Sequence, residues 1–251
     1  MKFRTIANRQ FRRQPGKRRP HKLRAALLVL CGIMVIGAGI FVLLLHKPAD
    51  FIQPEPIENS EVSKYLTHVL SRDLYNGAQR EEPFELVISQ DGINDIVARF
   101  KWPQKAGGVS ISVPEIIFEP GTIILRGMVN SAQLEILVTI SGTAFTDEDG
   151  MLNLVVRNIK VGALNVTVLA KVMAQGLYEN EMANREPKPD RWSEKIFAAV
   201  LEGKPFDPVL KIEDKKVRIS AVDIAQGRMT LYMVPADTNS IVSVSAEQKD
   251  G

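Results

Sequence analysis

The pattern of apolar and polar positions separates one long uncharged run from a region of short periodic segments. Residues 25–45 (AALLVLCGIMVIGAGIFVLLL) contain no charge over 21 positions. At about 1.5 Å per residue, a helix of this length crosses the roughly 30 Å hydrocarbon core of a bilayer. A cleavable signal peptide is the alternative, but the run is longer than its usual apolar region and ends in His46 and Lys47, without a small-x-small cleavage site. The sequence therefore predicts an uncleaved transmembrane helix.

Beyond this run, helical and extended patterns alternate. Apolar residues spaced three and four apart predict a helix that begins at Asn59 or Ser60 and stops at Gly77. Residues 84–88 (FELVI) predict a short strand, and Ser89 is the expected cap of a second helix. The apolar positions of that second helix fall on one face. They are Ile93, Ile96, Val97 and Phe100.

Between residues 109 and 158 the apolar positions alternate with a period of two. Turn sequences at 119–121 and 147–150 separate the segments, which is typical of an antiparallel meander. Residues 116–118 and 123–125 are apolar on both faces. The sheet is therefore expected to be covered on both sides or curved around something apolar.

The last third of the chain predicts two helices and a hairpin. A helix is expected over 166–182, and Asp190 caps a following helix that ends at Gly203. Strands are expected over 209–225 and 228–234. This order of elements indicates an α+β fold: an N-terminal transmembrane helix followed by an antiparallel curved β-sheet packed on amphipathic helices.

The charge distribution gives the chain a direction. Ten of the 32 Lys and Arg residues lie in the first 24 positions, and no Asp or Glu precedes Asp50. Lys and Arg beside a span stay on the cytoplasmic side, so the N-terminus is expected inside the inner membrane and the rest outside it. The expected parts are a basic cytoplasmic tail (1–24), the transmembrane helix (25–45), a linker (46–59), an exported α+β domain (60–234) and a flexible C-terminal tail (235–251).

The inventory of reactive side chains does not favour catalysis. The expected exported part has one histidine, His68, no cysteine and no nucleophile-elbow sequence. Residues 147–150 (DEDG) resemble the start of a calcium loop, but Asn153 and Arg157 do not complete it, so a hairpin turn is favoured. The basic tail lacks a nucleic-acid-binding motif. We expect no enzyme, no metal, no cofactor and no nucleic-acid partner.

The apolar stripe of the second predicted helix and that of the helix expected over 166–182 are the candidate site. Core packing is the simpler interpretation of each, and the alternative is that the helices and a curved sheet enclose an apolar groove for a lipid chain. The expected partners are membrane lipids and, secondarily, other envelope proteins. The candidate ligand-binding residues of this apolar seam are Ile93, Val97, Phe100, Val166, Leu169, Met173 and Leu177.

Several segments resemble the YpmS-like family of exported, membrane-anchored proteins. They are FELVISQDGINDIVARF (84–100), VPEIIFEPGTIILRGMV (113–129), NLVVRNIKVGALNVTVLAKVM (153–173) and KKVRISAVDIAQGRMTLYMV (215–234). Gly162 and Leu164 match a family motif, whereas its usual proline is absent between Asn165 and Val168. The family's pattern, like that of the LmeA lipoproteins, is similar to the tubular lipid-binding (TULIP-like) fold. The resemblance implies binding of lipid or an envelope polymer.

Two hypotheses follow from these patterns. The first is a single-pass, non-catalytic extracytoplasmic protein that binds lipid or another apolar envelope ligand. The second is a structural scaffold of an envelope or cell-division assembly, similar in layout to FtsQ. The FtsQ layout places a strand directly after the span, whereas here a proline-containing linker and a helix are expected.

Overall fold

The computed structural model describes residues 20–57, 61–106, 108–131, 134–182 and 192–236, and the chain forms two compact units, Met1–Val42 and Leu43–Gly251. Helix α1 (Pro20–Leu44) provides the described part of the first unit and ends in the second. Within the described residues it is the one helix long and apolar enough to span a membrane, a test that a signal sequence also passes.

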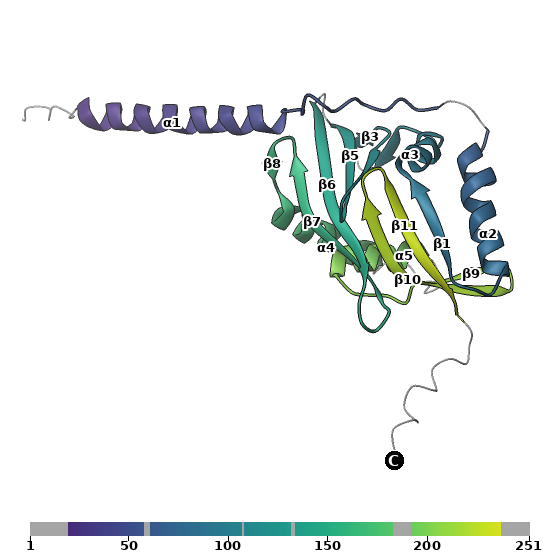
Figure 1. The fold of residues 1–251 in the computed structure, drawn as a ribbon. Coiled ribbons are helices and arrows are strands. Elements are labelled where there is room, and N and C mark those ends of the chain that lie inside the picture. Colours follow the sequence, from purple (N-terminus) through teal and green to yellow (C-terminus); the bar gives the residue numbers. More distant parts are fainter. Residues whose placement is uncertain (1–19, 58–60, 107, 132–133, 183–191, 237–251) are drawn as a thin grey trace, which may run out of the picture. The chain divides into compact units, whose positions relative to one another are not determined.

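The second unit contains two antiparallel sheets (Figure 1). The smaller one has four strands in the order β1-β11-β10-β9. Its first strand pairs with its last in sequence, from Phe84 opposite Met233 to Ser89 opposite Arg228. The strands are β1 (Phe84–Ser89), β9 (Val209–Ile212), β10 (Lys215–Ala225) and β11 (Arg228–Pro235).

The larger sheet has seven strands and is the expected meander. Its order is β2-β3-β5-β6-β7-β8, with β4 also paired to β5. The strands are β2 (Gln104–Ala106), β3 (Val109–Ile111), β4 (Glu115–Glu119), β5 (Thr122–Ser131), β6 (Leu134–Thr146), β7 (Leu152–Val161) and β8 (Leu164–Asn165). The predicted α+β class and antiparallel arrangement are confirmed, in two open sheets.

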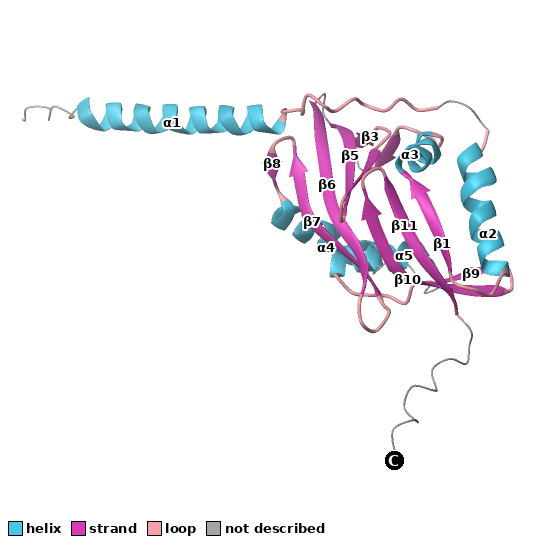
Figure 2. Cartoon of the chain, in the orientation of Figure 1, coloured by secondary structure: helices cyan, strands magenta, loops and turns pink. Residues whose placement is uncertain are grey.

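The helices of the second unit pack against both sheets (Figure 2). A π-helical turn, η1 (Leu66–Leu70), continues into α2 (Ser71–Gln79), which lies on β1 and β10. Helix α3 (Gln90–Ala98) packs on β1 and β4. Helix α4 (Thr167–Met182) lies on β7, and α5 (Trp192–Glu202) contacts β7 and α4.

Two buried clusters fill the second unit. The larger joins the four-stranded sheet to helices α2 and α5 and to β7, and the smaller lies where the two sheets meet. Phe118 on β4 is 2% exposed and joins Ala144 of β6 to Ile224 of β10 in the smaller cluster. The members of the larger cluster are Ala78, Leu86, Leu152, Ala199, Phe206, Val217, Ile219 and Met233.

Some element boundaries differ from the expected ones. The helix formed by η1 and α2 is capped by Ser63, whose Oγ accepts the Leu66 N–H. The caps expected for this helix, Asn59 and Ser60, lie outside the described residues. Gly77 lies inside α2 rather than at its end, and a Cβ there would overlap the ring of Phe84. The helix therefore needs glycine at this position for packing.

The end of the chain also departs from the expectation. The strand predicted over 209–225 is two strands, because the chain turns at Glu213, which has a φ of +54°. Short strands β2 and β8 were not expected. Pro235 belongs to β11 rather than to a tail. Residues 237–251 and the expected cap Asp190 lie outside the described residues.

Candidate functional site

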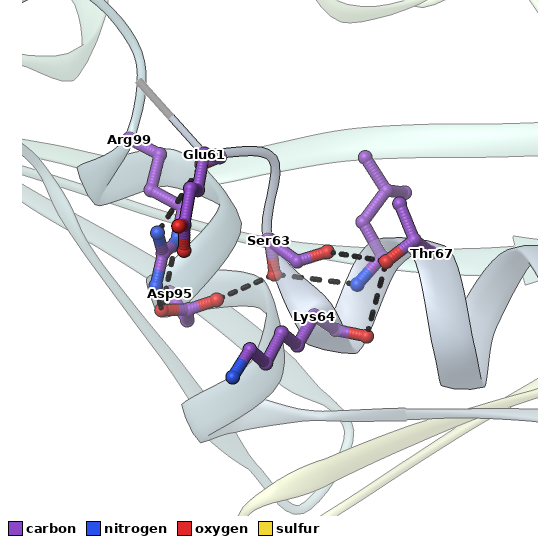
Figure 3. Close-up of polar contacts among 7 residues, drawn as sticks. Glu61, Ser63, Lys64, Thr67, Asp95 and Arg99 are labelled. Atoms are coloured by element: carbon purple, nitrogen blue, oxygen red, sulfur yellow. Dashed lines mark hydrogen bonds and ion pairs between the residues drawn. The ribbon is translucent and has the colours of Figure 1, made fainter. Parts of the chain in front are cut away.

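A polar cluster joins the start of the η1–α2 helix to α3 (Figure 3). Ser63 is 3% exposed and its hydroxyl donates to Asp95 Oδ2 at 2.5 Å. The other carboxylate oxygen of Asp95 accepts from Nε and Nη2 of Arg99 at 3.1 and 3.0 Å. Arg99 also donates to the backbone oxygen of Glu61 at 3.2 Å. The cluster thereby fixes two helix ends against each other.

The chemistry of this cluster is that of a structural joint. Hydrogen bonding to Arg99, and secondly to Ser63, holds the pKa of Asp95 below its usual value. Ser63 Oγ also accepts the Leu66 N–H, so the hydroxyl caps a helix while it donates to a carboxylate. His68 contacts Thr67 Oγ1 at 2.8 Å rather than the Ser63 hydroxyl. The prediction that the chain is not an enzyme stays a prediction.

A tyrosine closes the same joint from its other side. The Tyr65 hydroxyl accepts the Ser89 N–H at 2.8 Å and lies 3.3 Å from the Val87 carbonyl oxygen, to which it donates. A Cβ on Gly92 would overlap the Tyr65 ring. The Tyr65 ring therefore packs directly on the glycine in the first turn of α3.

The carboxylate of Asp147, in the acidic turn at 147–150, accepts its hydrogen bonds from the turn and from the residues just after it. Asp147 Oδ1 accepts the backbone N–H groups of Asp149 and Met151, and Oδ2 accepts from Asn153 Nδ2. These bonds lower the pKa of Asp147, the Asn153 bond contributing most. Among the described residues, no three His, Cys, Asp or Glu side chains lie together as a metal site would require.

The most unusual surface is one face of α4. Four large apolar side chains on it are exposed: Val168 by 79%, Leu169 by 61%, Val172 by 65% and Met173 by 59%. At 3.6 residues per turn these positions span an arc of about 140°. The half-buried positions of α4 include the small residues Ala170 and Ala174. The first two turns of α4 thus present large apolar residues outward, which normally marks a surface that binds something apolar. We call Val168, Leu169, Val172 and Met173 the α4 face.

The start of α4 is rigidly placed on β7. Asn165 Oδ1 accepts the Thr167 N–H at 3.0 Å and caps the helix. The Ile159 N–H donates to Thr167 Oγ1 at 2.8 Å, and the Val166 N–H donates to the Ile159 carbonyl, also at 2.8 Å. These bonds give α4 a defined start without a proline.

The last two residues of α1, Leu43 and Leu44, and the residues after them belong to the second unit. The Ala163 N–H donates to the Leu43 carbonyl oxygen at 2.8 Å. Gly162 has a φ of +58°, and a Cβ there would overlap the carbonyl oxygens of Leu43 and Leu44. Further along, Lys47 pairs with Glu135 at 3.2 Å. Residues 43–47 are therefore held beside the turn that leads into α4.

A second ion pair binds the linker to the meander. Arg126 on β5 donates to Asp50 Oδ2 at 2.9 Å, which lowers the pKa of Asp50. Glu115 lies opposite Arg126 in the β4–β5 register. Burial raises the pKa of Glu115, and its Oε2 has no hydrogen-bond partner among the described residues. Arg126 therefore lies near two carboxylates, the exposed Asp50 and the half-buried Glu115.

The predicted seam residues lie on separate parts of the unit. Ile93 packs against the cluster around Phe118, and Val97 is half-buried, whereas Phe100 is 59% exposed. On α4, Val166 is half-buried, Leu169 and Met173 point outward, and the side chain of Leu177 lies outside the described residues. Helix α3 packs on β1 and β4, whereas α4 packs on β7 and α5. The predicted stripe on α3 and the predicted stripe on α4 therefore lie against different strands.

Half of the α4 face was not among the predicted seam residues. Val168 and Val172 complete it, and they are the more exposed pair. The signal was the width of the apolar arc, because Val168, Leu169, Val172 and Met173 cover more of the helix than one buried stripe requires.

Comparison with known proteins gives no assignment by similarity. The chain matches no family model and no curated protein.

Proposed function

We propose that this chain is a single-pass, membrane-anchored, non-catalytic protein whose extracytoplasmic domain binds lipid or another apolar envelope ligand. The observation that carries the proposal is the α4 face, with four large apolar side chains exposed on one side of one helix. Burying such side chains is favourable by roughly 1.5–3 kcal/mol each. A ligand that covered the face would therefore gain a substantial part of its binding free energy there.

The anchor and its direction belong to the same proposal. Residues 27–44 form a helix of sufficient length and apolarity, and the basic residues precede it. The positive-inside rule then places the N-terminus in the cytoplasm and the second unit outside the inner membrane. The resemblance to the YpmS-like family and a TULIP-like packing of sheet on helix are part of this proposal, supported by the order of elements between residues 84 and 235.

A scaffold in an envelope or cell-division assembly is the second candidate. The packing of Ile93 favours it, because this predicted seam residue packs against the buried cluster around Phe118, where a ligand groove was expected. The two functions differ in what the α4 face contacts.

The anchor can be tested by mass and extraction. We expect the full chain to stay in the membrane pellet at alkaline pH, because an uncleaved apolar helix does not dissociate. Intact mass spectrometry of the purified protein should include residues 1–24. Loss of those residues through cleavage, together with release into the soluble fraction, would show that α1 acts as a signal sequence.

Ligand binding can be tested by photocrosslinking. We expect a photoactivatable phospholipid, incorporated into membranes that hold the full chain, to label the tryptic peptides 161–171 and 172–185, which carry the α4 face. Replacing Val172 and Met173 with aspartate should abolish labelling of these peptides and leave labelling of the anchor unchanged. Val87→Asp is the matched control on β1, where Val87 is 46% exposed. This substitution should leave the labelling of both α4 peptides unchanged. Labelling confined to the anchor would favour the scaffold.

A further inference from the structure

The α4 face has a specific position in the chain's path, and this position indicates what covers it. Leu43 lies two residues before the end of the uncharged run, so in an anchored chain it lies where the helix leaves the bilayer. The Ala163 N–H is bonded to its carbonyl oxygen, and α4 begins four residues later at Thr167. This holds whatever angle α1 makes with the second unit, because Leu43 and Ala163 belong to the same compact unit.

The close approach of Leu43 and Leu44 to the turn before α4 depends on a glycine at position 162. Only a residue without a Cβ fits at Gly162 beside the carbonyl oxygens of Leu43 and Leu44, and its positive φ also favours glycine. The Lys47–Glu135 and Asp50–Arg126 pairs continue the attachment along the linker. Helix α4 has 16 residues and is about 24 Å long, and the α4 face occupies its first two turns.

The charges around the α4 face suit a phospholipid surface, and the acidic residues of the helix, Glu179 and Glu181, belong to its last turn. From Gly150 to Tyr178 the chain has no acidic residue and three basic ones, Arg157, Lys160 and Lys171. This stretch contrasts with residues 48–251 as a whole, where acidic residues outnumber basic ones by eight. All three basic side chains are exposed. An exposed apolar arc flanked by lysine is typical of a helix that lies in the membrane interface.

We propose that α4 lies in the interface of the outer leaflet of the same bilayer that anchors the chain, with the α4 face among the acyl chains. The inference rests on the proposed membrane anchoring and names the source of the lipid. Lys160 and Lys171 lie at headgroup level, where anionic lipids attract them. The domain is thereby held at the membrane by two attachments, the span and α4.

Fluorescence quenching in proteoliposomes tests the inference with the full chain. In a Cys31→Ala background, Val172→Cys carries an environment-sensitive NBD label, and Val87→Cys is the matched control on β1. The vesicles contain phosphatidylethanolamine, phosphatidylglycerol and lipid spin-labelled at carbon 5 of the acyl chain. We expect blue-shifted emission and several-fold stronger quenching at position 172 than at position 87. Both positions are exposed, so neither substitution removes core packing.

The outcomes separate this inference from the proposed function. Equal, weak quenching at both positions in a chain that resists alkaline extraction overturns the bilayer contact and leaves the anchor standing. A chain that is released from the vesicles overturns the anchoring itself. Stoichiometric phospholipid that stays crosslinked or bound to α4 after delipidation in detergent shows that the face holds one extracted lipid molecule, which overturns docking on the bilayer.

Discussion

Replacing Phe118 with alanine is expected to lower the free energy of unfolding of the second unit by about 3–5 kcal/mol. Phe118 is 2% exposed and contacts residues of both sheets, so its removal leaves a cavity that neither sheet can close alone. For a domain of this size the melting temperature should fall by roughly 6–20 °C. Thermal unfolding of the full chain in detergent micelles, followed by near-UV circular dichroism, measures the change.

Phe145→Ala is the matched control for this experiment. Phe145 lies on β6, next to Ala144 of the Phe118 cluster, but is 43% exposed. Its replacement should cost less than about 1 kcal/mol, since surface substitutions usually have small effects. Equal losses for Phe118→Ala and Phe145→Ala would contradict a shared core between the two sheets.

Asp95→Asn is expected to destabilise the second unit by about 1–3 kcal/mol at neutral pH. The substitution keeps the shape of the side chain but removes the charge that accepts from Ser63 and Arg99. Because the pKa of Asp95 is lowered in the folded state, its stabilising contribution is present above the unfolded value of 3.8 and is lost as the pH falls through the folded pKa. The wild type and the variant should therefore converge in stability at low pH.

Urea unfolding at a series of pH values measures this difference. Asp223→Asn, an exposed position on β10, is the matched control and should change stability by less than about 0.5 kcal/mol. A constant difference between wild type and Asp95→Asn down to pH 2 would show that the carboxylate charge is not what holds the joint.

The elements fixed by local pattern are the ones that the sequence predicted best. Ser89 caps α3 and accepts the Gly92 N–H, as its position before Asp91 and the apolar stripe indicates. The meander follows the alternation of apolar residues from β3 to β7. Both features depend on residues close in sequence.

The errors occurred where the local pattern does not show how elements pack or where the chain turns. Gly77 resembles a helix stop until Phe84 is packed over it, and the turn at Glu213 has no glycine to indicate it. Similarly, the spacing of Leu169 and Met173 shows only that they share a face. That Ala170 and Ala174 take the half-buried positions, and that the larger residues face outward, depends on the packing of α4 against β7.

The pairing of β1 with β11 has a consequence for how the protein is made. About 149 residues separate Phe84 from Met233, so at roughly 5–20 residues per second the ribosome needs on the order of 7–30 s to supply the second strand after the first. During that interval β1 emerges with an unpaired edge, whereas β3 to β7 pair with neighbours that arrive in immediate succession. The seven-stranded sheet is thus completed first, and the nascent chain depends on its final fifth for the other sheet.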